Sequence, residues 1–398
     1  MSRTKQTLLA LVVIASVVLA ACGGGGGGGG KEAIKIGAIH DLTGPTSDVG
    51  TPYAEGLKAY VEWANANGGI NGHPIELLSA DYAYKVDQAE QLYSQYVQEG
   101  VVAFQGWGTG DTEALRSRIA EDKIPFMSAS YSANLLDMEV APYNFLIGTS
   151  YSDQGIIALQ WAMEDWADSG NSGTPKVAFI HHDSPFGQSP IPDMQAFADA
   201  NGIEFMTIAM PKATDFVAEL AQIQQFGANY VIVHTVSSPA AVLVKDAKSQ
   251  GMMDSVKFIN LNWCADEIFI NLAGDAAEGV YGAIPFTPPS DPVPGHEAPA
   301  QWLKEHGSTL EEKGLHFVQG WWTMAVMAEG IKRVLDAGQD VTGENIKAAL
   351  ESIQNFDTGG VTYPISFSPT SHRGNVALRL YQVQNGQWVR ISDYIQAP

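Results

Sequence analysis

Ile34-Lys35-Ile36-Gly37-Ala38-Ile39 is a short apolar run that predicts a β-strand. Residues 53–67 follow with their apolar side chains on one face, which predicts an amphipathic helix. Gly68-Gly69-Ile70-Asn71-Gly72 ends this helix, because glycine and asparagine accept the left-handed backbone found at helix C-termini. Residues 75–79 are again strand-like. The segment therefore predicts a βαβ unit, in which the two strands are parallel.

The same alternation continues over most of the chain. We expect helices at residues 86–98 and 112–121 and strands at 101–105 and 124–128. A second series begins near Asp153, with helices at 154–168, 194–201, 215–226 and 240–250 and strands at 176–180, 204–208, 230–234 and 256–259. The pattern indicates two α/β lobes, each with a parallel sheet that is covered on both faces.

The C-terminal third has a different pattern. A proline-rich stretch at residues 285–299 interrupts the alternation, and long helices are expected at 317–337 and 342–352. Residues 376–384 and 387–394 alternate around Asn385-Gly386, which is a strong signal for a tight hairpin. We therefore expect a small antiparallel addition to the second lobe.

The N-terminus has the layout of a bacterial lipoprotein signal. A basic start leads into an apolar run from Leu8 to Ala21, which is shorter than a membrane-spanning helix requires. Leu19-Ala20-Ala21-Cys22 then supplies small residues for cleavage, and eight glycines follow. We expect residues 1–21 to be the signal peptide, Cys22 to be lipidated, and residues 22–33 to form a Gly-rich tether. An ordinary cleaved signal without lipid is the alternative.

Composition limits the partners of the chain. The formal net charge is −22, so the surface should repel nucleic acid and anionic lipid headgroups. Once Cys22 is lipidated, Cys264 is the one remaining thiol and no intramolecular disulfide can form. Export predicts an extracytoplasmic protein that is anchored to a membrane through its lipid.

In an open parallel sheet, ligands bind beyond the carboxyl ends of the strands. The loops expected at those ends are rich in hydroxyls, glycines and aromatic side chains, a combination that suits a small organic acid or zwitterion. These loops are Asp41-Leu42-Thr43-Gly44-Pro45, Gly106-Trp107-Gly108-Thr109-Gly110-Asp111, Ala129-Ser130-Tyr131-Ser132, Asp183-Ser184-Pro185-Phe186-Gly187, Thr235-Val236-Ser237-Ser238 and Asn260-Leu261-Asn262-Trp263.

Each of these residues also has a purely structural interpretation. Thr109, Ser130 and Ser132 are residue types that cap helices. The aromatic side chains of Trp107, Tyr131 and Trp263 are of types equally common in hydrophobic cores. Both interpretations remain open from the residues alone.

Motifs for cofactors and catalysis are weak or missing in the sequence. His181-His182-Asp183 does not favour a metal, because adjacent side chains on a strand point in opposite directions. Residues 106–111 lack the third glycine of a dinucleotide fingerprint. The sequence contains no G-x-S-x-G, P-loop or H-E-x-x-H motif. We expect no metal and no cofactor.

The order and spacing of several short motifs resemble those of the branched-chain amino acid-binding proteins of ABC importers, which are type I periplasmic solute-binding proteins. The resemblance covers residues 34–398 and rests on these motifs: Ile36-Gly37-Ala38, Leu42-Thr43-Gly44-Pro45, Asn67-Gly68-Gly69-Ile70-Asn71-Gly72, Asp153-Gln154-Gly155, Pro185-Phe186-Gly187 and Leu272-Ala273-Gly274-Asp275-Ala276-Ala277-Glu278-Gly279.

The resemblance implies a fold of two doubly wound, parallel-sheet lobes joined by a three-crossover hinge that closes on a ligand. Lobe I would comprise residues 34–152 and 281–361. Lobe II would comprise residues 153–280 and 362–398.

The resemblance also implies a ligand site. It places the ligand carboxylate on Thr109 and on the loop Ser130-Tyr131-Ser132. Further contacts would come from Val49, Phe186, Phe317, and Val236 or Ser237, with Trp107 and Trp263 as aromatic neighbours.

One position departs from the family pattern. Amino-acid binders of the family commonly hold the ligand ammonium with an acid at the position that aligns with Asn262, and an amide supplies no charge. Either Asp41, Asp111 or Asp183 replaces that acid, or the ligand has no ammonium group.

The expected function is that of a lipid-anchored solute-binding protein, and not an enzyme. It would deliver a small carboxylate-bearing solute to the permease subunits of an ABC importer, as a monomer and without nucleic acid. The alternatives are a ligand-sensing module of the same fold and an exported hydrolase.

Overall fold

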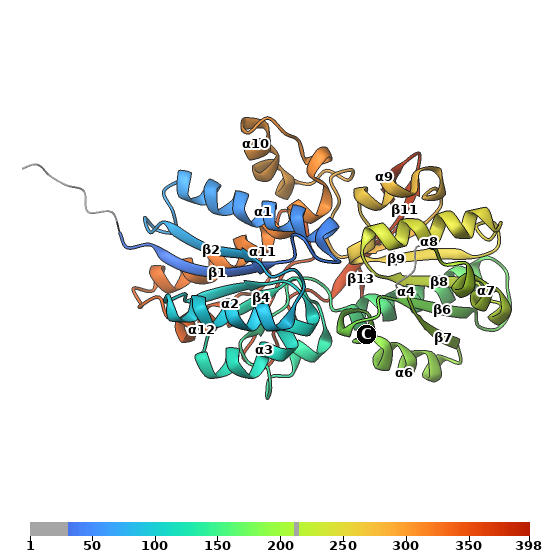
Figure 1. Ribbon diagram of the computed structural model, residues 1–398, viewed down its shortest axis with the longest axis horizontal. Coiled ribbons are helices and arrows are strands. Elements are labelled where there is room, and N and C mark those ends of the chain that lie inside the picture. Colours follow the sequence, from blue (N-terminus) through green and yellow to red (C-terminus); the bar gives the residue numbers. More distant parts are fainter. Residues whose placement is uncertain (1–30, 211–214) are drawn as a thin grey trace, which may run out of the picture.

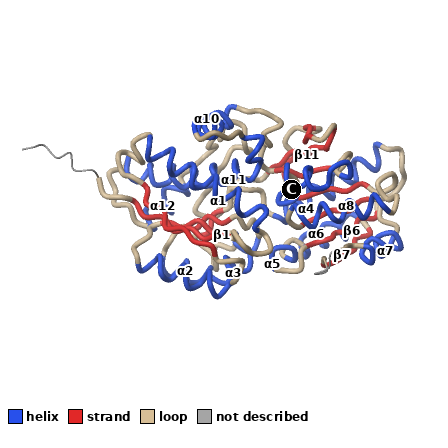
Figure 2. Tube along the Cα trace, turned by 45° about the horizontal axis from the view of Figure 1, so that its top comes forward, coloured by secondary structure: helices blue, strands red, loops and turns tan. Residues whose placement is uncertain are grey.

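The computed structural model describes residues 31–210 and 215–398. The predicted signal peptide, Cys22 and most of the tether lie outside the described residues. Two lobes lie side by side along the long axis of the molecule (Figure 1). In Figure 2 the strands of each lobe lie between layers of helices, which is the predicted α/β arrangement.

Lobe I contains a five-stranded, fully parallel sheet in the order β2-β1-β3-β4-β5. Its strands are Ile34–His40 (β1), Ile75–Asp81 (β2), Ala103–Gly106 (β3), Phe126–Ser128 (β4) and Asn144–Phe145 (β5). Its helices are Ser47–Ala66 (α1), Val86–Gln98 (α2), Thr109–Asp122 (α3), Glu297–Glu305 (α10), Leu310–Asp336 (α11) and Gly343–Glu351 (α12). Helices α1 and α11 lie on one side of β1, and α2 and α3 lie on the other (Figure 1).

Lobe II contains the sheet β12-β11-β10-β9-β8-β6-β7, with β13 also paired to β11. Strands β6 to β10 are parallel, and β11, β12 and β13 run antiparallel to their partners. The strands are Lys176–His181 (β6), Glu204–Ala209 (β7), Tyr230–His234 (β8), Lys257–Leu261 (β9), Tyr281–Ile284 (β10), Ala377–Gln384 (β11), Gln387–Arg390 (β12) and Ile395–Gln396 (β13). The helices are Tyr151–Asp168 (α4), Pro185–Gln188 (α5), Ile191–Asn201 (α6), Val217–Phe226 (α7), Ser237–Ser249 (α8) and Glu267–Ala273 (α9).

The chain crosses between the lobes three times, and polar bonds hold the three crossovers together. The Thr149 hydroxyl donates to the Ala377 carbonyl at 2.6 Å, which joins the first crossover to the third. Asn375 Nδ2 lies 3.5 Å from the Pro285 carbonyl, which joins the third to the second. The predicted fold of two parallel-sheet lobes joined by three crossovers is therefore confirmed.

The expected lobe boundaries differ from the sheet membership in two places. Strand β10 (Tyr281–Ile284) pairs with β9 and β11, so the second crossover follows β10 and does not precede it. Residues 365–374 still bond to lobe I, because the Leu146 amide donates to the His372 carbonyl and the Gly374 amide to the Leu146 carbonyl. The third crossover therefore begins near residue 375.

The predicted hairpin is present between β11 and β12. Asn385 and Gly386 both have positive φ angles, 55° and 73°, as a two-residue hairpin turn of this twist requires. Among the residues that the structure describes, no helix is both long and apolar enough to cross a membrane.

Candidate functional site

A pocket of about 260 Å³ lies where the two lobes meet. Five of the six loops expected at strand ends contribute residues to its lining. The sixth loop, residues 41–45, immediately precedes the lining residue Thr46. The residues that line it are Thr46, Val49, Tyr84, Trp107, Gly108, Thr109, Ala129, Tyr151, Phe186, Val236 and Trp263. The space that these side chains enclose is small, so the pocket suits a small solute.

A pair of hydroxyls forms the polar end of the pocket. Thr109 is the first residue of α3, and its Oγ1 lies 2.7 Å from Ser130 Oγ, after β4. The N-cap position of α3 is Gly108, which has no side chain to occupy the amides of the first turn. A helix N-terminus with two adjacent hydroxyls favours an anionic group.

Trp107 is fixed by a chain of hydrogen bonds that begins at β1. Its indole Nε1 donates to Thr46 Oγ1 at 2.9 Å. The Thr46 hydroxyl in turn donates to Asp41 Oδ2 at 2.7 Å, and Asp41 also accepts the backbone amides of Gly44 and Thr46. The Asp41 carboxylate therefore shapes the turn after β1 and orients the indole ring.

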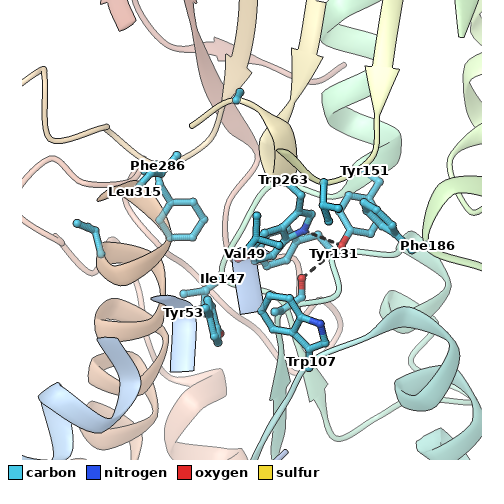
Figure 3. Packing of buried hydrophobic residues seen from close by; sticks show 14 of the residues in the cluster. Val49, Tyr53, Trp107, Tyr131, Ile147, Tyr151, Phe186, Trp263, Phe286 and Leu315 are labelled. Atoms are coloured by element: carbon cyan, nitrogen blue, oxygen red, sulfur yellow. Dashed lines mark hydrogen bonds between the residues drawn. The ribbon is translucent and has the colours of Figure 1, made fainter. Parts of the chain in front are cut away.

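Tyr151 links the first crossover to lobe II. Trp263 Nε1 donates to the Tyr151 hydroxyl at 3.0 Å, and that hydroxyl lies 3.3 Å from the Ala129 carbonyl (Figure 3). Burial raises the pKa of Tyr151 above its usual value, so the phenol stays protonated. It is therefore a neutral group, and it donates its one O–H to the Ala129 carbonyl.

Aromatic rings form a continuous floor behind the pocket. Trp107 and Trp263 meet with centroids 5.1 Å apart, and Tyr53 lies edge-on to both. Tyr131 stacks on Trp263 at 5.7 Å, and its ring also packs over Gly148. Figure 3 shows the rings of Trp107, Tyr131 and Trp263 near one another.

Lobe II covers the pocket with apolar surface. Phe186 comes from the short helix α5, and its ring packs against Tyr151 and His234 with centroids 5.2 and 4.3 Å apart. Burial lowers the pKa of His234 to about 3, so the imidazole is neutral, and its Nε2 lies 3.1 Å from the Phe186 carbonyl. Val236, which precedes α8, completes this wall.

Two contacts join the lobes at the mouth of the pocket. The Asp48 carboxylate of α1 accepts both the backbone amide and the hydroxyl of Ser238, at 2.9 and 2.6 Å. Pro185 of lobe II also lies close to Gly110 of lobe I. A Cβ placed on Gly110 would be 3.6 Å from the proline ring. The structure is therefore that of a closed pocket.

A buried polar network stands behind Trp263. The Trp263 ring stacks on His316 of α11 with centroids 5.1 Å apart. Asp266 accepts from Ser237 and bonds to His316, and His316 Nδ1 lies 2.7 Å from Gln319 Oε1. Burial alone would lower the pKa of His316, but the Asp266 carboxylate outweighs it and raises this pKa. The network ties lobe I to lobe II.

Asn262 belongs to that network and does not line the pocket. Its Oδ1 accepts from Gln319 Nε2 at 2.6 Å, and its backbone amide donates to Gln154 Oε1 at 3.1 Å. Its Nδ2 has no hydrogen-bond partner within the protein. The amide at this position therefore faces a neutral glutamine from the other lobe.

The structure brings together some of the predicted site residues and separates others. Val49, Trp107, Thr109, Phe186 and Trp263 line the pocket. Ser130 and Tyr131 lie directly behind it, bonded to Thr109 and stacked on Trp263.

Four other predicted site residues lie away from the lining. Ser132 caps the short helix Ala133–Leu136 and donates to Glu113 Oε1 at 2.7 Å. Phe317 lies between α1 and α10 in a separate surface groove. Ser237 and Asn262 belong to the buried network.

Val236 takes the place that the sequence left open between Val236 and Ser237, and three lining residues lie outside both the loops expected at strand ends and the predicted site residues: Thr46, Tyr84 and Tyr151. Tyr84 follows Ala83, and both have positive φ angles, 58° and 51°. Consecutive non-glycine residues in this conformation are strained, and such strain gathers at functional sites. Thr46 and Tyr151 lie at or next to helix starts, where proximity depends on the tertiary fold.

Comparisons with known proteins agree with this geometry. The Leu, Ile, Val, Thr and Ala-binding protein of Pseudomonas aeruginosa is 22% identical over 321 residues, which cover 80% of this chain and 83% of that protein. A branched-chain amino acid ABC transporter protein of Thermus thermophilus, solved with bound valine, superposes with a TM-score of 0.86 at 26% identity. That superposition covers 93% of this chain and 97% of the other.

A substrate-binding protein of an ABC transporter from Aeropyrum pernix superposes with a TM-score of 0.83 at 28% identity, over 92% of this chain and 97% of the other. The sequence profile of the periplasmic binding proteins matches residues 33–387. The resemblance expected from the motifs is thereby confirmed, and the chain belongs to the periplasmic binding protein family.

Proposed function

We propose that this protein binds a small carboxylate-bearing solute outside the cytoplasm and delivers it to the permease of an ABC importer. The family and the names of the relatives support this function. The observation that carries the proposal is the pocket itself. It takes residues from the strand ends of both lobes, and the Asp48–Ser238 bonds close it.

The two-lobed arrangement gives the delivery mechanism. A solute that touches both lobes has more contacts in the closed form than in an open one. A ligand shifts such an equilibrium by its differential affinity for the two forms, so solute binding favours closure. The permease would recognise the outer rims of both lobes in the closed form.

Lipid on Cys22 would hold this protein at the membrane. A Gly-rich chain of eight residues spans on the order of 15 Å, which would keep the lobes close to the permease. The substitution Cys22→Ser should release the protein from the membrane and leave its affinity for solute unchanged. Retention at the membrane after this substitution would argue against the lipid anchor.

Thermal shift with a panel of amino acids, aromatic acids, short aliphatic acids and amides tests the proposal. A ligand at 100 times its Kd adds about 2.7 kcal/mol to the free energy of unfolding, which raises Tm by several degrees. The bound solute should be released unchanged. Turnover of any panel compound would instead support an exported hydrolase. Binding without any effect on uptake in cells would support a sensing module.

A further inference from the structure

The lining of the pocket carries no formal charge. Among the described residues that form it, none is an aspartate, glutamate, lysine, arginine or histidine. Its polar side-chain groups are the hydroxyls of Thr46, Tyr84, Thr109 and Tyr151, and the Trp107 and Trp263 indole N–H groups, which already donate within the protein. A solute held here must therefore find its polar partners among neutral groups.

The acids on the surrounding loops are already engaged. Asp41 accepts two backbone amides and the Thr46 hydroxyl, and it thereby fixes the turn after β1. Asp48 accepts the Ser238 amide and hydroxyl at the mouth. Asp266 bonds to Ser237 and to His316 in the network behind Trp263. Asp183 is exposed and accepts from Gln188.

Asp111 is the remaining acid, and it lies behind the backbone of the pocket. Its Oδ1 accepts from the Tyr82 hydroxyl at 2.8 Å. A Cβ added to Gly108 would lie 2.2 Å from the same oxygen, so the glycine backbone lies against this carboxyl. Burial raises the pKa of Asp111 to about 7, which removes much of its charge at neutral pH. Asp111 does not line the pocket, so an ammonium group held there would not contact its carboxyl directly.

An ammonium group would be unfavourable in these surroundings. A buried cation without a countercharge loses its hydration and gains too little in return. A carboxylate differs, because hydroxyl and amide donors can satisfy its oxygens without a positive charge. The Thr109–Ser130 pair and the first turn of α3 supply such donors.

The rest of the lining favours an apolar body on the solute. Trp107, Trp263 and Phe186 present ring surfaces, and Val49 and Val236 add aliphatic ones. On the basis of the proposed function, we infer that the solute is a small monocarboxylate that has an apolar body and no ammonium group.

Calorimetry on the full-length protein with matched pairs that differ by the amino group tests this inference. The pairs are L-leucine with 4-methylpentanoate, L-phenylalanine with 3-phenylpropanoate, and L-valine with 3-methylbutanoate. In any pair that binds, we expect the deaminated acid to bind at least tenfold more tightly at neutral pH. Equal or tighter binding of the amino acid would overturn the inference and leave the proposed solute-binding function intact.

Two further measurements make every outcome decisive. Asp111→Asn should leave the affinity for the acid unchanged, and loss of amino-acid binding in this variant would identify Asp111 as the ammonium partner and overturn the inference.

If no pair binds, mass spectrometry of the heat-denatured native protein identifies any solute that it carried. A solute without an amine supports the inference, and one with an amine overturns it. Release of no solute together with no binding overturns the proposed function as well.

Discussion

The two walls of the pocket differ in chemistry. Lobe I presents hydroxyls, because Thr46, Tyr84 and Thr109 all line its side. Lobe II presents Phe186, Val236 and Trp263, and its two polar groups, the Trp263 indole N–H and the Tyr151 hydroxyl at the start of α4, are bonded to each other. Directional hydrogen bonds can therefore orient the solute on lobe I, whereas non-directional apolar burial drives lobe II to close over it.

The bonded pair Asp266–His316 supports the apolar wall from behind Trp263. Removing this pair should have the largest effect of all the changes, and the effect should be on the free energy of unfolding. His316→Ala removes the partner of the buried Asp266 carboxylate and the ring on which Trp263 stacks. Removal of one partner of a buried pair costs about 3–5 kcal/mol, so we expect a loss of free energy of unfolding in this range. Denaturant unfolding measures it. His306→Ala, at an exposed histidine that stacks on Trp302, is the control and should cost far less.

The same pair should make stability depend on pH. Because the pKa of His316 is raised in the folded protein, its contribution is fully present below the ordinary histidine pKa. The free energy of unfolding should therefore fall as pH rises above about 6.5, through the raised pKa. A pH profile that is the same in the wild type and in His316→Ala would contradict this role.

The hydroxyl wall should control affinity. Thr109→Val keeps the shape of the side chain but removes its hydroxyl and leaves Ser130 without this partner. A hydrogen bond to a charged group contributes about 1.5–3 kcal/mol, so we expect affinity for the carboxylate to fall roughly 10- to 100-fold. Calorimetry measures the loss. Ser132→Ala is the matched control, because its hydroxyl serves Glu113 and a helix cap. Equal losses in both variants would mean that the structure misplaces the polar end.

The apolar wall should contribute less per residue, because its rings are already partly packed against the protein. Phe186→Ala removes a ring that also contacts Tyr151 and His234. We expect affinity to fall about tenfold, toward the lower end of the free energy of burying a phenylalanine. The association step should change little, since orientation depends on lobe I. A variant that binds as tightly as the wild type would show that lobe II does not cover the solute.

Loss of the Asp48–Ser238 contact at the mouth should have the smallest effect on affinity. Asp48→Asn retains an acceptor for Ser238, so we expect affinity at neutral pH to change less than about fivefold. Burial raises the pKa of Asp48 in the closed form, so closure favours its protonated state. Wild-type affinity should therefore rise as pH falls toward the carboxyl range. Calorimetry across pH should find a flatter profile in Asp48→Asn, and an unchanged slope would exclude this carboxyl as its source.

Much of the fold could be predicted because the helix and strand periods are local properties of the sequence. Residues 86–98 form α2 with the bounds that their spacing predicts. Strand β10 was missed because Tyr281–Ile284 is only four residues long and adjoins the proline-rich stretch. Helix α9 was missed because it has only seven residues, and α10 was missed because it begins inside the proline-rich stretch.

The site was predictable at the level of loops and less so at the level of side chains. Strand ends meet at one edge of a sheet, which places Trp107, Thr109 and Trp263 at the pocket. Local turn geometry then decides which neighbour faces the pocket, and it turns Ser132 toward Glu113. Tyr151 reaches the pocket from a crossover, which no local pattern reveals.

Closure of the two unlike walls on one solute is the central claim, and a distance measured between the lobes tests it most directly. Spin labels at the exposed positions Gln95→Cys on α2 of lobe I and Ala196→Cys on α6 of lobe II would report the distance between the lobes, in a Cys22→Ser background where Cys264 is buried. Double electron–electron resonance should show a broad, longer distance without solute and a shorter, narrower one with 4-methylpentanoate or whichever deaminated acid binds. The same distance distribution with and without saturating solute would contradict the account.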